Sequence, residues 1–224
     1  MTDDTDYSQF GEQPIILDFL KTTDRPHTRF CVDAGAFDGS EGSNSRALFE
    51  LGWDGLAIEP NPRSFSRLKT LHADRPGVIC LQRALSSQRQ SAVPMKFCIG
   101  PVGTPEEHQW QYGQVSTFSE SFAAHYEKNH EWTYETQPVD VDTLTNVMRA
   151  YAVPRDLGFL SIDCEGEDLK ILEELDMAAF RPLLVCLESE DANRHIFAQI
   201  IEPRGYAFHA KTRSNTFYVR TGPV

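Results

Sequence analysis

Short apolar runs alternate with amphipathic helical patterns along most of the chain. The first pattern, EQPIILDFLKT from residue 12, has apolar residues at helical spacing and tolerates Pro14 in its first turn. The runs that follow are rich in Val, Ile, Leu and Cys and do not alternate with polar residues, which is typical of strands covered on both faces. We predict strands in RFCVDAG, WDGLAIEP and GVICLQRAL, with helices in SNSRALFELG and PRSFSRLKTLHA.

The second half repeats this rhythm after an irregular segment. VPMKFCIG indicates a further strand, and TQPVDVDTL a strand that leads into the helix TLTNVMRAYA. Strands and helices then alternate through LGFLSIDCEG, EDLKILEELD, PLLVCLESE and ANRHIFAQIIEPRG. The end, GYAFHAKTRSNTFYVRTG, alternates around a polar turn and predicts an antiparallel hairpin. Residues 101–136 are aromatic and polar without a clean period, which indicates an insertion with a function or with mobility.

This order of elements predicts an α/β fold with a mostly parallel sheet and helices on both faces. A length of 224 residues suits a single domain over residues 1–224. In such sheets, ligands bind beyond the carboxyl ends of the strands, near the point where the strand order reverses. The candidate site therefore lies in the segments that follow strands: 33–38, 59–61, 84–86, 163–167 and 188–193.

Composition narrows the partners and the compartment. With 21 Lys and Arg against 33 Asp and Glu, the net charge of -12 repels a phosphate backbone, so a nucleic-acid partner is not favoured. No apolar stretch approaches the roughly 20 residues of a membrane helix, so we expect no membrane partner. The acidic start MTDDTDYSQF differs from a signal peptide, and the five cysteines contain no C-x-x-C pair. We expect a cytoplasmic protein with reduced, buried thiols.

The turn CVDAGAFDGSEGSNS at residues 31–45 holds the first candidate binding residues. Its glycines are costly to order, which suggests that a ligand lies against them. A dinucleotide turn would read G-x-G-x-x-G, whereas this one reads G-A-F-D-G. Asp33 and Asp38 would repel phosphate and suit a cationic ligand that is rich in hydrogen-bond donors.

Glu59 ends the second predicted strand, 59 − 33 = 26 positions after Asp33. An acid at this place in a nucleotide-binding sheet accepts hydrogen bonds from both ribose hydroxyls. The turn and this acid together indicate a nucleoside without phosphates. S-adenosylmethionine meets this description, because it combines a nucleoside with a sulfonium cation and an ammonium group.

The sequence resembles the FkbM-type methyltransferases. The resemblance rests on YSQFGEQPIILDFL, on VDAGAFDGSEGSNSRALFELGWDGLAIEPNPRSFSRL, on FLSIDCEGEDLKILEEL, on CLE and on the closing hairpin. It implies a Rossmann-like, seven-stranded class I methyltransferase sheet that binds S-adenosylmethionine and most often methylates an oxygen. Residues 98–136 lie outside the resemblance, and we expect them to form an insertion or lid over the acceptor pocket.

The resemblance also assigns residues. Asp33, Gly35 and Asp38 would lie under the methionine and ribose, together with Ala36 and Gly39 of the same turn. Glu59 would hold the ribose hydroxyls. The rest of the cofactor set would be Pro60 and Asn61 at the adenine edge, Ala84 and Leu85 flanking the ring, and Asp163. Asp163, Glu165 and Gly166 match the D-x-E-G motif and would face the methyl-transfer centre.

The acids of SIDCEGED have two interpretations. So many carboxylates after a buried strand raise one another's pKa, so they serve a cation, a shared proton or hydrogen-bond donors. We favour such a function for Asp163 and Glu165, as base for the acceptor hydroxyl. Glu167 and Asp168 instead suit the first turn of a helix. The histidines that could serve as the base, each of which is more often solvated or structural, are His125, His130 and His195; we retain His195 as a candidate.

A magnesium site is the alternative for the same acids. Asp163 after one strand and Glu188, Asp191 and Asn193 after the next offer hard oxygen ligands. The segment EDAN is also a plausible capped helix start, and we favour a site without metal.

The aromatic residues of the insertion also have two interpretations. They can stack on a flat or saccharide acceptor, or they can form the insertion's own small core. The residues are Trp110, Tyr112, Phe118, Phe122, Tyr126, Trp132 and Tyr134.

Three functions are compatible with the sequence. The first is an S-adenosylmethionine-dependent O-methyltransferase that acts on a hydroxyl of a small molecule, natural product or sugar. The second is an NAD(P)-dependent oxidoreductase, which the missing G-x-G-x-x-G and Asp38 disfavour. The third is a non-catalytic nucleoside-binding module, in which the Asp163 cluster would be structural.

Overall fold

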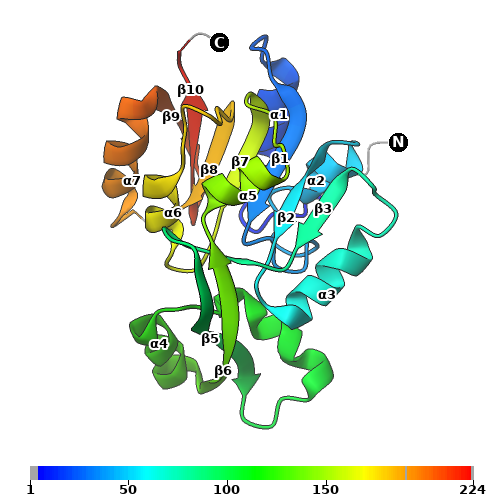
Figure 1. Ribbon diagram of the computed structural model, residues 1–224, viewed down its shortest axis with the longest axis vertical. Coiled ribbons are helices and arrows are strands. Elements are labelled where there is room, and N and C mark those ends of the chain that lie inside the picture. Colours follow the sequence, from blue (N-terminus) through cyan, green and yellow to red (C-terminus); the bar gives the residue numbers. More distant parts are fainter. Residues whose placement is uncertain (1–4, 190, 223–224) are drawn as a thin grey trace.

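A seven-stranded sheet forms the centre of the protein. The structure is a computed structural model and describes residues 5–189 and 191–222. Figure 1 shows the sheet in the upper part of the molecule. In spatial order its strands are β3 (Val78–Leu81), β2 (Asp54–Ile58), β1 (Thr28–Ala34), β7 (Leu157–Ile162), β8 (Leu184–Glu188), β10 (Asn215–Arg220) and β9 (Tyr206–Lys211).

The strand directions confirm the predicted fold class. The first five strands of this order are parallel, and β1 pairs with both β2 and β7, Val32 lying opposite Leu56 and Leu160. The order therefore reverses between β1 and β7. β10 pairs antiparallel with β8 and with β9, so the closing segment is the predicted hairpin.

Helices cover both faces, as the continuous apolar strands require. Successive side chains of a strand point to opposite faces, so Cys31 and Val32 of β1 belong to two different core clusters. The Cys31 cluster includes apolar residues of α1 (Glu12–Thr22), α2 (Arg46–Glu50) and α3 (Pro62–Leu71). The Val32 cluster includes those of α5 (Leu144–Ala150), α6 (Asp168–Glu174) and α7 (Arg194–Ile201), after which the short helix η2 (Glu202–Arg204) leads into the hairpin.

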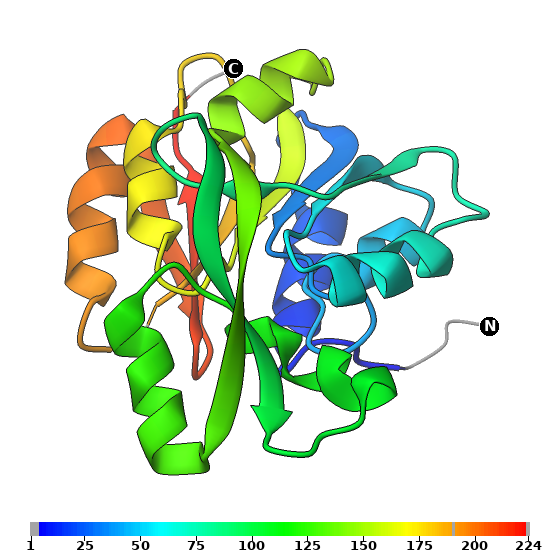
Figure 2. The same cartoon turned by 60° about the horizontal axis from the view of Figure 1, so that its bottom comes forward.

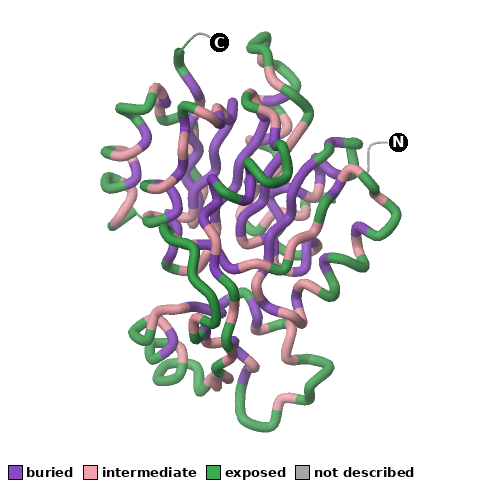
Figure 3. The backbone as a smooth tube through the Cα atoms, in the orientation of Figure 1, coloured by how far each residue is buried: buried purple, intermediate pink, exposed green. Residues whose placement is uncertain are grey.

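A second, three-stranded sheet lies below the first one in Figure 1. Its strands are β4 (Ala84–Leu85), β6 (Trp132–Asp142) and β5 (Gln90–Pro101), and its helices are η1 (Glu106–Val115) and α4 (Glu120–His130). The run GVICLQRAL is therefore not one strand: β3 ends at Leu81, and Ala84 pairs with Val141 in the second sheet. Figure 2 shows the long β5–β6 pair from another side, and Figure 3 shows that this part is more exposed than the main sheet.

Part of the aromatic segment packs on itself. The ring of Tyr126 stacks on Trp132 with centroids 5.1 Å apart, and Tyr112 meets Trp132 edge-on at 5.4 Å. In the same sheet, Met95, Phe97 and Val141 form a small apolar cluster with Ala84. The insertion thus has contacts of its own, although it lacks a helical or strand period in the sequence.

All five cysteines are free thiols; those at positions 31, 98 and 186 are buried, and Cys80 and Cys164 are partly buried. Among the described residues, no helix is long and apolar enough to cross a membrane.

Glu12 ties the N-terminal helix to the closing hairpin. Its fully buried carboxylate accepts hydrogen bonds from the backbone N–H of Phe10 at 2.7 Å, from the hydroxyl of Thr212 and from the amide of Asn215 at 3.2 Å. Glu12→Ala would leave these donors unpaired, so we expect it to lower the free energy of unfolding by about 2–3 kcal/mol. Urea unfolding measures this. Glu107→Ala, an exposed acid on η1, is the control, and an equal loss in both variants would contradict the assignment.

Candidate active site

A large cavity opens at the carboxyl ends of the parallel strands, where the main sheet faces the second sheet. Its volume is about 1060 Å³, and residues from every predicted segment line it. From the turns and strand ends these include Asp33, Gly35, Ala36, Glu59, Pro60, Ala84, Leu85, Asp163, Glu165, Glu188 and Asn193. Most of the predicted site therefore comes together at the point where the strand order reverses.

Gly35 allows β1 and β7 to approach each other at this point. Its φ is +88°, and a Cβ atom there would lie 1.6 Å from the carbonyl oxygen of Asp163. The N–H of Asp163 donates to the carbonyl of Ala34 at 2.9 Å. Position 35 therefore requires glycine because any Cβ atom would clash with the backbone of the loop after β7. The sequence alone does not show this contact.

Asp33 is a buried acid at the floor of the cavity. Burial raises its pKa to about 6, while a hydrogen bond from the hydroxyl of Ser45 opposes the rise. Next to it, the amide of Asn44 donates to the hydroxyl of Ser161 at 3.2 Å. Asn44 and Ser161 also line the cavity, and sequence reasoning missed both. The signal that could have found Asn44 is its place at the entry to α2, directly after the glycine turn.

Asp38 and Gly39 do not line the cavity, although they belong to the same turn. The buried carboxylate of Asp38 accepts from the N–H and hydroxyl of Ser40 and from Arg67 at 3.4 Å. A Cβ on Gly39 would lie 2.6 Å from Leu68 of α3. We had expected both residues to face a ligand. Instead, the carboxylate of Asp38 is engaged in local hydrogen bonds, and Gly39 packs against α3.

Glu59 lies at the end of β2 with its carboxylate held by the backbone. It accepts from the N–H of Phe37 at 3.0 Å and from the N–H of Asn61 at 2.7 Å. Burial raises its pKa to about 8, although both hydrogen bonds favour the ionised form. Since a carboxylate has about four acceptor positions, two remain for a ligand.

Asn61 supports this strand end without lining the cavity. Its side chain caps α3 by accepting from the N–H of Arg63 at 3.0 Å, and its amide donates to Ser116 at 3.2 Å. Pro60, Ala84 and Leu85 do line the cavity, on the same side as Glu59. Of the two residues expected at the adenine edge, Pro60 lines the cavity, whereas Asn61 caps α3.

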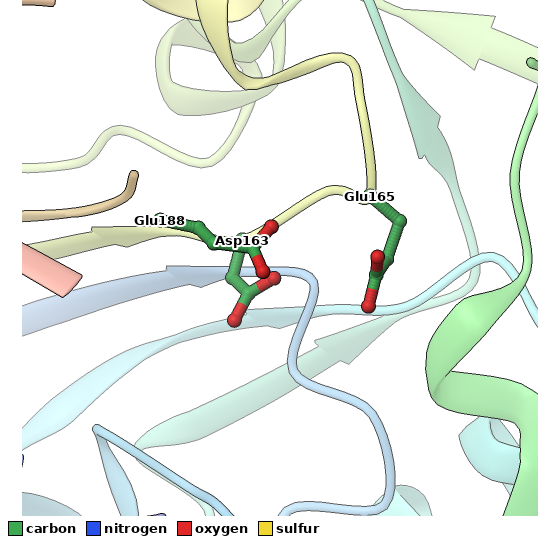
Figure 4. A group of neighbouring side chains, drawn as sticks. All are labelled: Asp163, Glu165 and Glu188. Atoms are coloured by element: carbon green, nitrogen blue, oxygen red, sulfur yellow. The ribbon is translucent and has the colours of Figure 1, made fainter. Parts of the chain in front are cut away.

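Three carboxyl groups meet at the ends of β7 and β8. Ligand oxygens of Asp163, Glu165 and Glu188 lie within 4.8 Å of one another, and Figure 4 shows their side chains converging from the two strand ends and the loop. Burial, followed by the charges of Glu188 and Asp168, raises the pKa of Asp163, whose carboxyl is hydrogen bonded to that of Glu188. Burial and the charge of Asp163 raise the pKa of Glu165.

Such a cluster suits a shared proton or a cation. Asp191, which we had considered as a metal ligand, is exposed and pairs with Lys211 at 3.2 Å and with Arg194 at 2.5 Å. The hydrogen bond from Lys211, with that from Arg194, lowers its pKa. Glu188 and Asn193 line the cavity beside Asp163, whereas Asp191 does not.

Glu167 and Asp168 hold the loop in place. Asp168 accepts from the N–H groups of Cys164 at 2.7 Å and of Gly166 at 3.2 Å, and Glu167 accepts from the hydroxyl of Ser86 at 2.5 Å. Both acids lie at the start of α6, as the helix interpretation expects. Their additional contacts link the loop to the helix and to the end of β4.

The histidines do not reach the acidic cluster. His195 is exposed on α7 and does not line the cavity, and His125 and His130 are exposed on α4. Phe118, Phe122 and Tyr126 of the insertion line the same cavity as the acidic cluster. Tyr126 also stacks on Trp132, so it belongs both to the cavity lining and to the insertion's own packing.

Comparison with known protein families gives one match. A model of the methyltransferase FkbM domain matches residues 33–209. No curated protein sequence matches the chain.

Three of the solved structures that match this chain have low sequence identity to it. A methyltransferase FkbM from Methylobacillus flagellatus KT is 12% identical with a TM-score of 0.49 over 86% of this chain, which spans 43% of that one. A precorrin-6y C5,15-methyltransferase from Geobacter metallireducens GS-15 is 11% identical with a TM-score of 0.46, over 92% of this chain and 85% of that one. A ribosomal protein L11 methylase from Lactobacillus delbrueckii subsp. bulgaricus is also 11% identical at 0.46, over 94% and 78%.

The domain match identifies the family. It begins at Asp33 in the first glycine turn, includes Glu59 and the Asp163 loop, and ends in β9. These are the residues that carry the resemblance in the sequence and that line the cavity in the structure. Because the match covers well over half of the sequence, the chain belongs to the FkbM methyltransferase family.

Proposed function

We propose that this methyltransferase uses S-adenosylmethionine to methylate a hydroxyl group of a small molecule or saccharide. The observation that carries the proposal is that one cavity holds both a backbone-bound acid, Glu59, at the end of β2 and a carboxyl cluster at the ends of β7 and β8. The first feature suits a nucleoside. The second suits removal of a proton from an acceptor.

The residues of the cavity fit the cofactor. The two acceptor positions left on Glu59 match the two ribose hydroxyls, and the apolar side chains of Pro60, Ala84 and Leu85 would flank the adenine. Asp33 lies in the cavity floor, where a carboxylate would favour the ammonium group of the methionine tail. When bound, S-adenosylmethionine supplies a methyl group on a positively charged sulfur.

The charges in the cavity argue against a dinucleotide. Among the described residues that line it, seven are acids (Asp33, Glu41, Glu59, Asp163, Glu165, Asp168 and Glu188) and two are arginines, Arg83 and Arg213. A diphosphate would oppose ionisation of these acids, whereas a sulfonium nucleoside would favour their ionised forms and be attracted to them. This balance disfavours the NAD(P)-dependent alternative.

Asp163 is the proposed base. Asp163 and Glu188 share a hydrogen bond, so one proton can serve both carboxyl groups and leave one ionised oxygen to accept the proton of a hydroxyl. A carboxyl group with a raised pKa is a stronger base than an exposed one. Glu165 borders the same space and would orient the acceptor hydroxyl or take its proton.

The insertion at residues 98–136 would complete the acceptor pocket. Phe118, Phe122 and Tyr126 face the cavity, and apolar residues of α6 and α7, such as Leu169 and Phe197, lie in the same lining. An acceptor with an apolar face would bury it there while its hydroxyl reaches the acidic cluster.

Calorimetry tests the proposal directly. We expect S-adenosylhomocysteine and S-adenosylmethionine to bind with a Kd on the order of micromolar, and NAD to give no heat at millimolar concentration. Adenosine is the matched control, because it keeps the ring and the diol but lacks the amino-acid tail, and it should bind more weakly. Binding of NAD would favour an oxidoreductase, and absence of binding by all four would favour a structural module.

A further inference from the structure

The backbone at Glu165 has a conformation that a side chain normally avoids. Its φ is +47°, in the left-handed region that is unfavourable for a residue with a Cβ atom. Five described non-glycine residues have positive φ, and two of them, Phe37 and Glu165, line the cavity. Such strain persists only where the surroundings hold it, and it gathers at functional sites.

Thr117, which is bridged to β5 of the second sheet, makes one of the contacts that hold Glu165 in this conformation. Its hydroxyl donates to the carbonyl of Glu165 at 2.8 Å and accepts from the N–H of Ser119 at 3.0 Å. Thr117 is itself fixed, because its backbone pairs in both directions with Lys96 of β5 at 2.9 and 3.0 Å and its exposure is 1%. A rigidly held hydroxyl beside β5 therefore binds the strained residue in the loop between β7 and α6.

The remaining bonds of the loop come from its own helix. Asp168 holds the N–H groups of Cys164 and Gly166, on either side of Glu165, and leaves the carbonyl of Glu165 to Thr117. Without the threonine hydroxyl, the peptide between Glu165 and Gly166 would be held only through the N–H of Gly166, and the backbone of Glu165 could relax away from its positive φ. The carboxyl group of Glu165 would then leave the position near Asp163 and Glu188 that Figure 4 shows.

We propose that Thr117 is a positioning residue, which holds Glu165 in its left-handed conformation and so keeps its carboxyl group in the acidic cluster. The inference rests on the proposed function for its kinetic consequence, but the hold itself is a property of the free protein. In this inference the insertion has two roles. It lines the acceptor pocket, and through Thr117 it fixes the backbone of one member of the acidic cluster.

Hydrogen exchange on the free protein tests the hold. Thr117→Val keeps the size of the side chain and removes the hydroxyl, and we expect it to speed exchange in residues 164–167 roughly fivefold to tenfold, with unchanged exchange in the strands of the main sheet. Thr117→Ser keeps the hydroxyl and should retain the protection. Ser119→Ala is the matched control, because it removes the side-chain cap of α4 but leaves the bond from Thr117 to Glu165.

Kinetics test the consequence. We expect Thr117→Val to lower kcat roughly tenfold while the Kd for S-adenosylhomocysteine stays within about twofold of the original, and Thr117→Ser to restore kcat. In a Glu165→Ala background, Thr117→Val should lower kcat no further, because both changes act through one group.

Different results would contradict the positioning role of Thr117 and the proposed function. Unchanged exchange at residues 164–167 in Thr117→Val would overturn the inference, and so would additive losses in the double variant. If exchange responds as expected but the original protein neither binds S-adenosylhomocysteine nor transfers a methyl group, the hold by Thr117 stands and the proposed function falls.

Discussion

Replacing Asp163 by asparagine is expected to lower kcat by about 10²- to 10⁴-fold, the usual contribution of a general base. Asparagine has the same shape and can donate to Glu188, so the carboxyl cluster loses a base without losing its packing. S-adenosylhomocysteine should still bind within severalfold, because Glu59 and the first glycine turn are untouched. The measurement is single-turnover transfer of a labelled methyl group at saturating cofactor.

The pH dependence follows from the raised pKa of Asp163. The base is active only when ionised, so kcat/KM should rise with pH until Asp163 has lost its proton, and this acidic limb should vanish in Asp163→Asn. Asp191→Asn is the matched control, since Asp191 follows the same β8 strand but is exposed and paired with lysine and arginine outside the cavity. Unchanged turnover in Asp163→Asn, with cofactor bound, would remove this residue from the mechanism.

A chelator separates the base from a metal ligand. In the proposed mechanism, the like charges of Asp163, Glu165 and Glu188 are relieved by protons and by the charge of the cofactor, so full activity is expected after exhaustive EDTA treatment. Loss of activity that Mg²⁺ restores would instead make the three carboxylates ligands of a divalent ion. Asp163→Asn would then fail through lost metal affinity.

The sequence predicts the main sheet well because its signals are local. Each strand is a short apolar run bounded by a turn, and each adjoining helix buries one face, so the element order alone implies a doubly wound sheet. The second sheet is harder to predict. β5 and β6 join residues as far apart as Gln90 and Val141, and Ala92 lies in a bulge at positive φ, so neither the partner nor the register is encoded locally.

The candidate site shows the same division. Asp33, Glu59 and Asp163 were found because acids that follow strands must meet at one edge of a parallel sheet. Asp38 was expected to face the ligand but does not line the cavity, and spacing does not reveal that Ser40 and Arg67 occupy its carboxylate. Thr117 carries no motif, and its proposed role depends on the backbone angle of Glu165 in the loop after β7.

Binding of S-adenosylhomocysteine at pH 7 is expected to release up to one proton, from Glu59. With a pKa of about 8 in the free protein, this acid is mostly protonated at pH 7. Two ribose hydroxyls donate best to the ionised form, so binding lowers the pKa and expels the proton. The observed binding enthalpy should therefore depend on the ionisation enthalpy of the buffer, and the affinity should rise by up to about tenfold per pH unit between pH 6 and 8.

The same shift sets the stability of the free protein. Because the pKa of Glu59 is raised on folding, from 4.5 to about 8, the folded state binds its proton more tightly than the unfolded state does. Its contribution to stability is therefore complete below pH 4.5 and is lost as the pH rises through 8. Urea unfolding between pH 5 and 8.5 should show this decline in the free protein, and bound S-adenosylhomocysteine should reduce it.

Glu59→Gln removes both effects at once. Glutamine offers one acceptor oxygen where the carboxylate offers two, so we expect the affinity for S-adenosylhomocysteine to fall roughly 10- to 100-fold at pH 8, as for loss of a hydrogen bond to a charged group. The buffer dependence and the pH dependence of binding should disappear with it. Glu50→Gln, an exposed acid on α2, should change neither. Proton release that persists in Glu59→Gln would mean that another cavity acid titrates, and an unchanged affinity would show that the ribose lies elsewhere.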